Sequence, residues 1–179
     1  MLKKFIVILL LCTAGSFAAW SQGRPTASRI GDLQLGVNYS NANSDYVPNR
    51  IRGYGFYGDF DFTQHYGVEV DFHQLSDPNS AVYERSYEVG GRYLRHYGRF
   101  APYIKALYGR GVFNFPLNEA NLAYNSANVG AGVDISVHPR INVRAEYEYQ
   151  RWFSFPPDGL TPQMYTFGVA YHFPAGNPR

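Results

Sequence analysis

The sequence is poor in cysteine and in net charge. Its 179 residues include one cysteine, Cys12, which lies in an apolar segment close to the N-terminus. If that segment is removed, the chain has no disulfide and no thiol chemistry. The formal net charge is only +2, and the two signs balance once Lys3 and Lys4 are removed as well. No basic patch remains that would indicate a nucleic-acid partner.

Long apolar runs and metal or cofactor motifs are also missing. Beyond the N-terminal segment, no stretch is apolar enough to cross a membrane as a helix. Any crossing must therefore be made by β-strands. The sequence has no HExxH, no CxxC and no glycine-rich phosphate loop, so it predicts no cofactor, no metal centre and no catalytic residue.

The N-terminus has the three parts of a secretory signal peptide. Lys3 and Lys4 form a charged start, and an apolar core runs from Phe5 to Leu11. Ser16-Phe17-Ala18 is a small-x-small cleavage site, which predicts a signal peptide over residues 1–18. Cleavage after Ser21 is the alternative.

Aromatic residues are abundant and follow a regular alternation. They make up 17% of the chain, while the mean hydropathy is −0.32. The pattern is sharpest in QMYTFGVAYHF, residues 163–173, where large apolar side chains alternate with small or polar ones. Successive side chains of a strand point to opposite faces, so this run presents one aromatic and one polar face.

The same alternation recurs in eight runs of about ten residues, the length that a tilted strand needs to cross a bilayer. The runs cover residues 30–40, 53–63, 68–73, 83–95, 102–115, 127–137, 141–150 and 163–173. Loop-forming residues fill 41–51, 76–81, 117–125 and 153–162, and short turns join the other pairs. Long and short connections thus alternate, which predicts an all-β fold: an eight-stranded antiparallel up-and-down transmembrane β-barrel over residues 30–173.

The aromatic end of the last run resembles the C-terminal signal of bacterial outer-membrane barrels. The chain is similar to the OmpA/OmpX-type family of small eight-stranded barrels, in which Tyr171 and Phe173 would belong to the assembly signal. That resemblance implies the outer membrane as location, outer-membrane lipids as surroundings, and the barrel-assembly machinery and periplasmic chaperones as partners. Residues 174–179 would form a short periplasmic tail.

Glycines decide which face of the sheet is inside. Gly36, Gly90 and Gly132 lie on the polar face, where a crowded concave interior gives small residues a steric use. The polar face is therefore predicted to line the lumen. In strand five Lys105 and Arg110 have opposite parity, and we expect Lys105 outside and Arg110 inside. The predicted lumen network consists of Asp59, Asp61, Glu69, Asp71, Glu88, Arg92, Arg110, Asp134, Arg144, Glu146 and Glu148.

The leading functional hypothesis is an outer-membrane barrel with a structural or surface-interaction role and a lumen plugged by ion pairs, because eight strands enclose little more than side chains. A narrow cation-favouring pore is the alternative, since acids outnumber arginines inside. A lipid-modifying enzyme or hydrophobic-ligand carrier is a third. Its only residue signal is His73, which lies near Asp71 and Ser76 in the sequence. The ligand of the long loops stays open.

Overall fold

The computed structural model describes residues 31–80, 82–115, 120–156 and 158–173. The predicted signal peptide, with either cleavage site, and the predicted tail lie outside the described residues. Within these ranges, no helix is long and apolar enough to cross a membrane.

The described residues form eight β-strands. They are β1 (Asp32–Asn43), β2 (Ile51–Asp61), β3 (Tyr66–Ser76), β4 (Tyr83–Leu94), β5 (Phe100–Phe115), β6 (Ala120–His138), β7 (Ile141–Trp152) and β8 (Gln163–Phe173).

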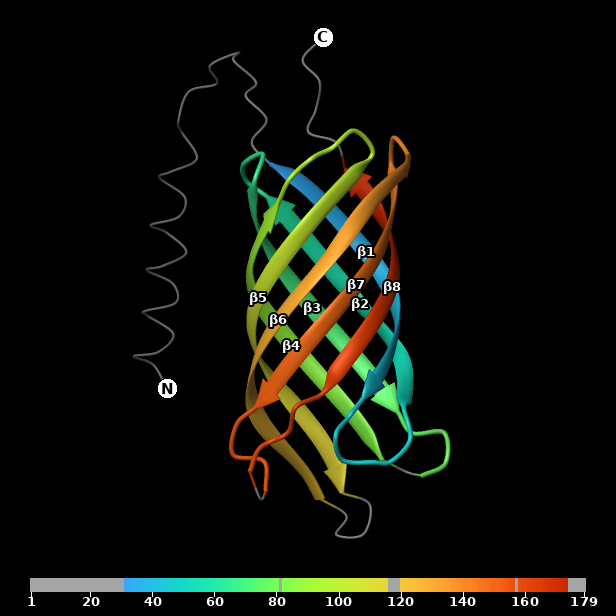
Figure 1. The fold of residues 1–179 in the computed structure, drawn as a ribbon, viewed down its shortest axis with the longest axis vertical. Helices are drawn as coiled ribbons and strands as arrows, with labels where there is room; N and C mark the ends of the chain where they lie inside the picture. The colour runs from blue at the N-terminus through green and yellow to red at the C-terminus, as the bar shows by residue number, and fades with distance from the viewer. Residues whose placement is uncertain (1–30, 81, 116–119, 157, 174–179) are drawn as a thin grey trace, which may run out of the picture. The chain divides into compact units, whose positions relative to one another are not determined.

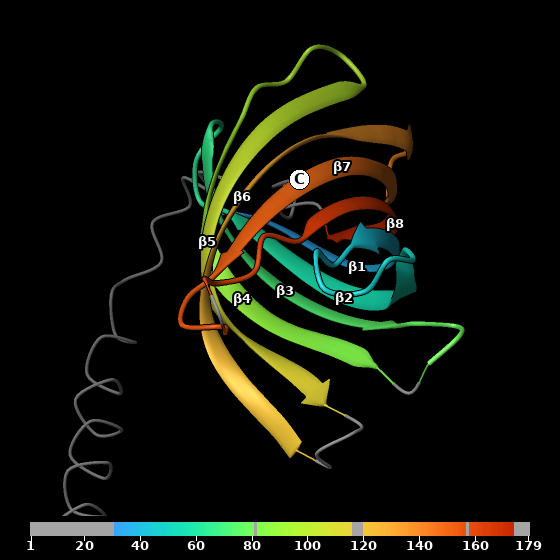
Figure 2. The ribbon, with the colours of Figure 1, turned by 60° about the horizontal axis from the view of Figure 1, so that its bottom comes forward.

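The strands form one closed barrel in chain order, and each is antiparallel to its neighbours (Figures 1 and 2). Pairing of β1 with β8 closes the sheet. The connections after β1, β3, β5 and β7 meet at the bottom of Figure 1, which we call the loop end; the connections after β2, β4 and β6 meet at the opposite, turn end. The predicted eight-stranded antiparallel up-and-down barrel is confirmed.

Alternation along each strand separates an apolar outer wall from a polar interior. On β1, Leu35 and Val37 are 50% and 55% exposed, whereas Gln34 and Asn38 are buried. In an open antiparallel sheet the polar face usually turns to water. Here the closed sheet turns its polar face inward, as the glycines predicted.

The outer wall ends in two successive rings near the loop end. Seven strands carry an aromatic residue at the last position of the apolar band: Tyr39, Tyr54, Phe72, Tyr87, Tyr108, Tyr149 and Tyr165. The polar ring lies on the same face of each strand, two residues closer to the loop end. Its members are Asn41, Arg52, Gln74, Arg85, Arg110, Asn125, Arg151 and Gln163.

Strand β6 begins earlier than predicted. The sequence predicts a loop over residues 117–125, but β6 starts at Ala120, and residues 117–119 lie outside the described ranges. The cross-strand pairs Val112↔Ala123 and Phe113↔Leu122 continue the β5–β6 ladder past the end of the neighbouring strands. As a result the β5–β6 hairpin projects at the loop end (Figure 1).

The predicted orientation of the fifth strand is wrong. Lys105 is buried and Arg110 is exposed. Lys105 is opposite Arg92, whereas Arg110 is opposite the outward Tyr87. Directly opposite residues of an antiparallel pair point to the same face, so the β4–β5 register fixes both side chains.

Candidate functional site

The lumen of the barrel holds most of the chain's acidic side chains. Apart from Arg110, every residue of the predicted lumen network is buried inside: Asp59, Asp61, Glu69, Asp71, Glu88, Arg92, Asp134, Arg144, Glu146 and Glu148. Lys105 joins them. Because buried charges are costly unless they are paired, the contacts among these groups determine what the site can do.

Two arginines, from β4 and β7, form the first cluster. Arg144 donates to Asp134 on the neighbouring strand over 2.8 Å and to Asp59 on the far side of the barrel over 2.5 Å. Arg92 also contacts Asp59, at 2.5 Å, and Asp134, at 2.8 Å. The two guanidinium groups therefore share the same two carboxylates, and a change to any one member disturbs the other three.

Lys105 is the centre of the second cluster. Its Nζ lies 2.6 Å from Asp71 and 2.9 Å from Glu69. The same Nζ lies 2.8 Å from Glu146 and 2.9 Å from Glu148. One ammonium group thus faces four carboxylates from β3 and β7, which explains why this strand must turn Lys105 inward despite its sequence context.

Two tyrosines cover the guanidinium groups. The centroid of the Tyr57 ring is 4.1 Å from the Arg144 guanidinium carbon, and that of Tyr103 is 4.6 Å from the Arg92 carbon. Tyr103 also donates a short hydrogen bond to Glu146. A cation over a ring face is attracted by the ring quadrupole, so the aromatic groups stabilise the charges and fill the lumen.

Inward glycines make room for these rings. A Cβ atom on Gly36 would lie 2.3 Å from the Tyr57 ring, and one on Gly132 would lie 2.6 Å from the Tyr103 hydroxyl oxygen. Both contacts are too short for a real side chain. The glycines on the polar face are thus the sites where large lumen side chains contact the wall, which is the steric use that the sequence predicted.

A layer of uncharged polar groups lies closer to the loop end. Gln150 donates to Glu148 over 2.7 Å and to Glu88 over 3.1 Å, and it accepts a 2.8 Å hydrogen bond from the Trp152 indole. This chain of contacts links the carboxylates to the apolar residues at the mouth.

Apolar clusters close the lumen at both ends of this polar column. At the loop end the mouth cluster consists of Val82, Phe113, Trp152, Phe155 and Leu160, with Ala42, Ile51, Leu75 and Met164 beside it. At the turn end Leu94, Ala101 and Tyr103 form a smaller cluster. Among the described residues the lumen is therefore filled by side chains along its length.

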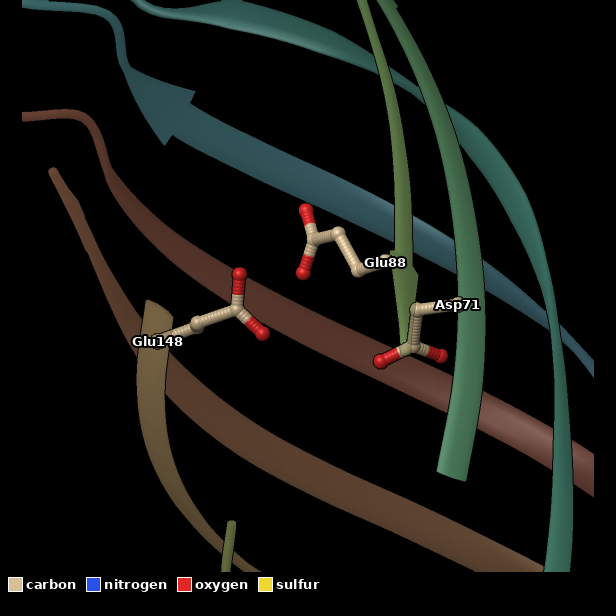
Figure 3. Close-up of side chains that lie close together, drawn as sticks. All are labelled: Asp71, Glu88 and Glu148. Carbon is tan, nitrogen blue, oxygen red and sulfur yellow. The ribbon is translucent and has the colours of Figure 1, made fainter. Parts of the chain in front are cut away.

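Three lumen carboxylates converge closely enough to be considered as metal ligands. Carboxylate oxygens of Asp71, Glu88 and Glu148 all lie within 4.8 Å of one another (Figure 3). However, Lys105 Nζ already contacts Asp71 and Glu148. The chain thus supplies its own cation at this position, and the geometry gives no reason to add a metal ion.

The histidine singled out in the sequence has a different neighbour from the one expected. His73 Nδ1 lies 3.4 Å from Ser40 Oγ, and Ser40 in turn lies 2.9 Å from Thr166. Ser76, the predicted neighbour, is exposed at the end of β3. The Ser40–His73 pair is buried beneath the mouth cluster, out of reach of lipid, and functions there as packing and hydrogen bonding within the lumen.

Comparison with protein families decides the class of this barrel. A model described as "Outer membrane protein beta-barrel domain" matches residues 5–173. The chain belongs to this family. The predicted resemblance to small bacterial outer-membrane barrels is thereby confirmed, and the family implies an outer-membrane location.

Solved structures show the same fold. Neisserial surface protein A has a TM-score of 0.61 at 16% identity, over 80% of this chain and 97% of that one. The N-terminal barrel domain of Pseudomonas aeruginosa OprF has a TM-score of 0.60 at 15% identity, over 80% and 99%. Ail of Yersinia pestis, solved with a heparin analogue, has a TM-score of 0.53 at 22% identity, over 80% and 99%. A comparison with curated protein sequences found no match.

Membership of the family orients the barrel in its membrane. Outer-membrane barrels have short periplasmic turns, longer extracellular loops and aromatic girdles at the two interfaces. The loop end is thus extracellular, and the ring of tyrosines and Phe72 marks the outer-leaflet interface. In this outer-membrane barrel the mouth cluster covers the lumen from the extracellular side, and Leu94, Ala101 and Tyr103 cover it from the periplasmic side.

Sequence reasoning missed several residues of the lumen. Tyr103, Glu84, Gln150 and Trp152 are buried there but were not among the predicted network. Parity alone could have placed Gln150 and Trp152 inside, because both share the face of Glu148 on β7. Tyr103 shares the face of Lys105 on β5, and it was missed because that face was predicted to point outward.

Proposed function

We propose that this protein is a non-conducting, non-enzymatic outer-membrane barrel with a structural or surface-interaction role. The observation that carries the proposal is the filled lumen, in which Arg92, Lys105 and Arg144 bind carboxylates across the full width of the barrel. An eight-stranded barrel is just wide enough for its side chains to fill it. The lumen side chains then stabilise the wall, and the outer surfaces make the contacts with other molecules.

A small cavity in the lumen supports a plug. A cavity of about 10 Å³ lies between His73, Glu84 and Trp152, beneath the mouth cluster. Such a cavity holds about one water molecule. A hydrated ion would have to displace the Gln150–Trp152 hydrogen bond and the aromatic residues above it to pass.

The projecting β5–β6 hairpin supports a role in surface interactions. Its pairing with β4 begins only at Phe113, and its pairing with β7 begins only at Ser126. Beyond the hydrogen bond from the Phe153 N–H to the Asn125 carbonyl oxygen, residues 120–124 of β6 have no partner on β7 and form a strand edge above the barrel wall. An unpaired edge offers backbone groups to a partner by strand addition, with side-chain pockets giving specificity.

Planar-bilayer recording of the refolded, full-length mature protein tests the plug. We expect no discrete conductance steps, because the ion pairs and the mouth cluster block the lumen. The matched control is the same preparation with Trp152→Gly and Gln150→Gly, which removes the hydrogen-bonded group beneath the mouth. Discrete steps from the wild-type protein would overturn the proposal.

A second candidate function is a narrow cation-favouring pore. It is favoured by the excess of acids over cations in the lumen. Among the described residues, three cations, Arg92, Lys105 and Arg144, are buried there with nine acids: Asp59, Asp61, Glu69, Asp71, Glu84, Glu88, Asp134, Glu146 and Glu148. The same recordings decide between the two. Wild-type steps with a reversal potential that reports cation selectivity would establish the pore in place of the plug.

A further inference from the structure

A groove hollows the outer wall over β3, β4, β5 and β6. Its volume is about 680 Å³, and its lining includes outward apolar residues of these strands and Phe62, which directly follows β2. Ligand pockets usually measure about 300–1,000 Å³ and are lined mainly by apolar and aromatic side chains. The groove therefore has the size and the lining of a site for an apolar ligand.

Two small residues side by side form the floor of the groove. Gly91 on β4 is directly opposite Ala106 on β5, and both are exposed on the outer face. Val68 on β3 and Val129 on β6 continue the same row on either side. A Cβ atom on Gly91 would meet only the Gly67 carbonyl oxygen, at 4.0 Å. The described side chains of the barrel thus leave the space above this floor open.

A second outward glycine shows the contrast. Gly58 on β2 is opposite Leu35 on one side and Val70 on the other, so it also faces the lipid. A Cβ atom on Gly58 would lie 3.2 Å from Leu35 Cδ2. The neighbouring strand therefore covers the gap at Gly58 with its own side chain, whereas the gap at Gly91 is left for another molecule.

The groove extends from its floor toward the turn end. Tyr66, Tyr93 and Ile104 form the next outward row in that direction, and all three line the groove. The outward pair on the extracellular side of the floor, Val89 with Tyr108, does not line it. Because the turn end of an outer-membrane barrel is periplasmic, the groove reaches the interface of the periplasmic leaflet.

An arginine lies where the groove reaches this interface. Arg95 follows Tyr93 by two residues, is exposed, and has its guanidinium carbon 5.7 Å from the centroid of the Tyr97 ring. It forms no salt bridge with an acid in the described part of the chain. A guanidinium group binds phosphate through parallel N–H donors, so the periplasmic end of the groove suits a phosphate group.

We propose that the groove binds an acyl chain of a phospholipid from the periplasmic leaflet, with the phosphate of that lipid at Arg95. The groove lies on the membrane-facing wall, so lipid chains are the apolar molecules that reach it. A chain that enters at the interface passes Tyr66 and Tyr93 and ends over Gly91. There it contacts protein below and on both sides, which a chain on the convex wall does not, and the added dispersion contacts favour it. This site is independent of whether the lumen is plugged.

The test uses the refolded mature protein in detergent micelles with phosphatidylglycerol that carries a diazirine near the end of one acyl chain. After illumination, mass spectrometry locates the labelled residues. We expect labelling to concentrate on the outward residues of β4 and β5 around Gly91 and Ala106. Gly91→Phe places a ring where the chain lies and should lower this labelling about tenfold.

A matched control adds the same ring outside the groove. Gly58→Phe also replaces an outward glycine by phenylalanine, and it should leave the labelling at the wild-type level. Heat-modifiable gel migration shows that each variant is folded. If Gly91→Phe does not fold, Ala106→Phe replaces it, with the same expected loss.

The phosphate contact has its own variant. Arg95→Gln removes one cation near the membrane surface and should lower labelling by phosphatidylglycerol about fivefold. Labelling by diacylglycerol with the same photoreactive chain should not change in this variant, because that lipid has no phosphate. An equal loss with both lipids would contradict the placement of the headgroup.

Four further results would overturn the proposal. Labelling spread evenly over the outward residues of all eight strands would show lipid contact without a site. Equal labelling of the Gly91→Phe and Gly58→Phe variants would remove the role of the floor. Complete displacement by free palmitate would show a fatty-acid site and contradict a phospholipid source. A dimer in native mass spectra that Gly91→Phe dissociates would place a second copy of the chain in the groove.

Discussion

The lumen and the outer wall of this barrel differ in how their cationic side chains are paired. Inside, three cationic side chains each contact several carboxylates, and Lys105 alone contacts four. Outside, the four arginines of the polar ring, Arg52, Arg85, Arg110 and Arg151, form no salt bridge with an acid in the described part of the chain. Both kinds of cation occur on β5, where Lys105 points into the lumen and Arg110 points outward. The side of the sheet to which a charged side chain points, rather than the residue type, therefore determines whether the charge stabilises the fold or is available to a ligand.

The largest expected effect comes from removing a cation from the lumen. Arg144→Met leaves Asp59 and Asp134 with one fewer partner and should lower the free energy of unfolding by about 3–5 kcal/mol, the usual cost of breaking a buried ion pair. Urea unfolding of the refolded barrel in lipid vesicles measures it. Arg110→Met is the control, because the same substitution on the wall removes no described ion pair and should change little. Equal midpoints for the two variants would remove the contrast between the regions.

Adding a cation to the wall should have the next largest effect, and the effect should depend on depth. Val169 lies between Val37 and Val143 in the apolar band, so Val169→Arg should cost about 2–4 kcal/mol. Gln163→Arg, on the same strand and face but in the polar ring, should cost at most about 1 kcal/mol. The same vesicle unfolding assay compares them. A larger loss from Gln163→Arg would show that the ring is misplaced relative to the membrane.

A smaller effect should distinguish the packing of the two faces. Gly132→Ala would bring a Cβ within 2.6 Å of Tyr103 and 2.8 Å of the Ala145 carbonyl oxygen, and such overpacking should cost about 1–3 kcal/mol. Gly91→Ala, on the outer face, would meet only the Gly67 carbonyl oxygen at 4.0 Å and should change stability by less than about 0.5 kcal/mol. Unfolding midpoints that coincide would indicate a lumen that is looser than its contacts imply.

The smallest effect on stability concerns the last strand, where we propose that Phe173 acts in assembly. Phe173 and Phe153 are 43% and 44% exposed, so their replacement by alanine should affect the finished fold similarly. Phe173→Ala should nevertheless lower the amount of protein in the outer membrane, as quantified by immunoblot of membrane fractions, because it changes the proposed assembly signal. Matching amounts of the two variants would refute that role.

Local alternation was sufficient to predict the strands, and it predicted the inward and outward faces of all of them except β5. The bounds of β8 agree with those read from the sequence, because its alternation is uninterrupted and both ends are aromatic. The projecting part of β6 could not be read in this way. Its asparagines favour loops locally, and only the ladder with β5 makes them a strand.

The partners within the lumen could not be predicted from parity. Which residues meet across the barrel depends on the stagger of all eight strands, to which each pair of neighbours contributes. His73 therefore meets Ser40 and not Ser76, and Arg92 from β4 reaches Asp134 on β6. The β5 register could have been predicted from the sequence only by recognising that Arg92 and Lys105 lie opposite each other and contact the same acid.

The ion pairs across the lumen also order the events of folding. Arg144 and Asp59 are 85 residues apart and come from β7 and β2, which are not neighbours in the sheet. Contacts between such distant segments form late, because the intervening chain must first be ordered. While the sheet is still open its charged face has no opposite wall, so ion pairs across the lumen, such as Arg144 with Asp59, can form only when β8 reaches β1. Closure of the barrel and formation of these cross-lumen pairs are then one cooperative step.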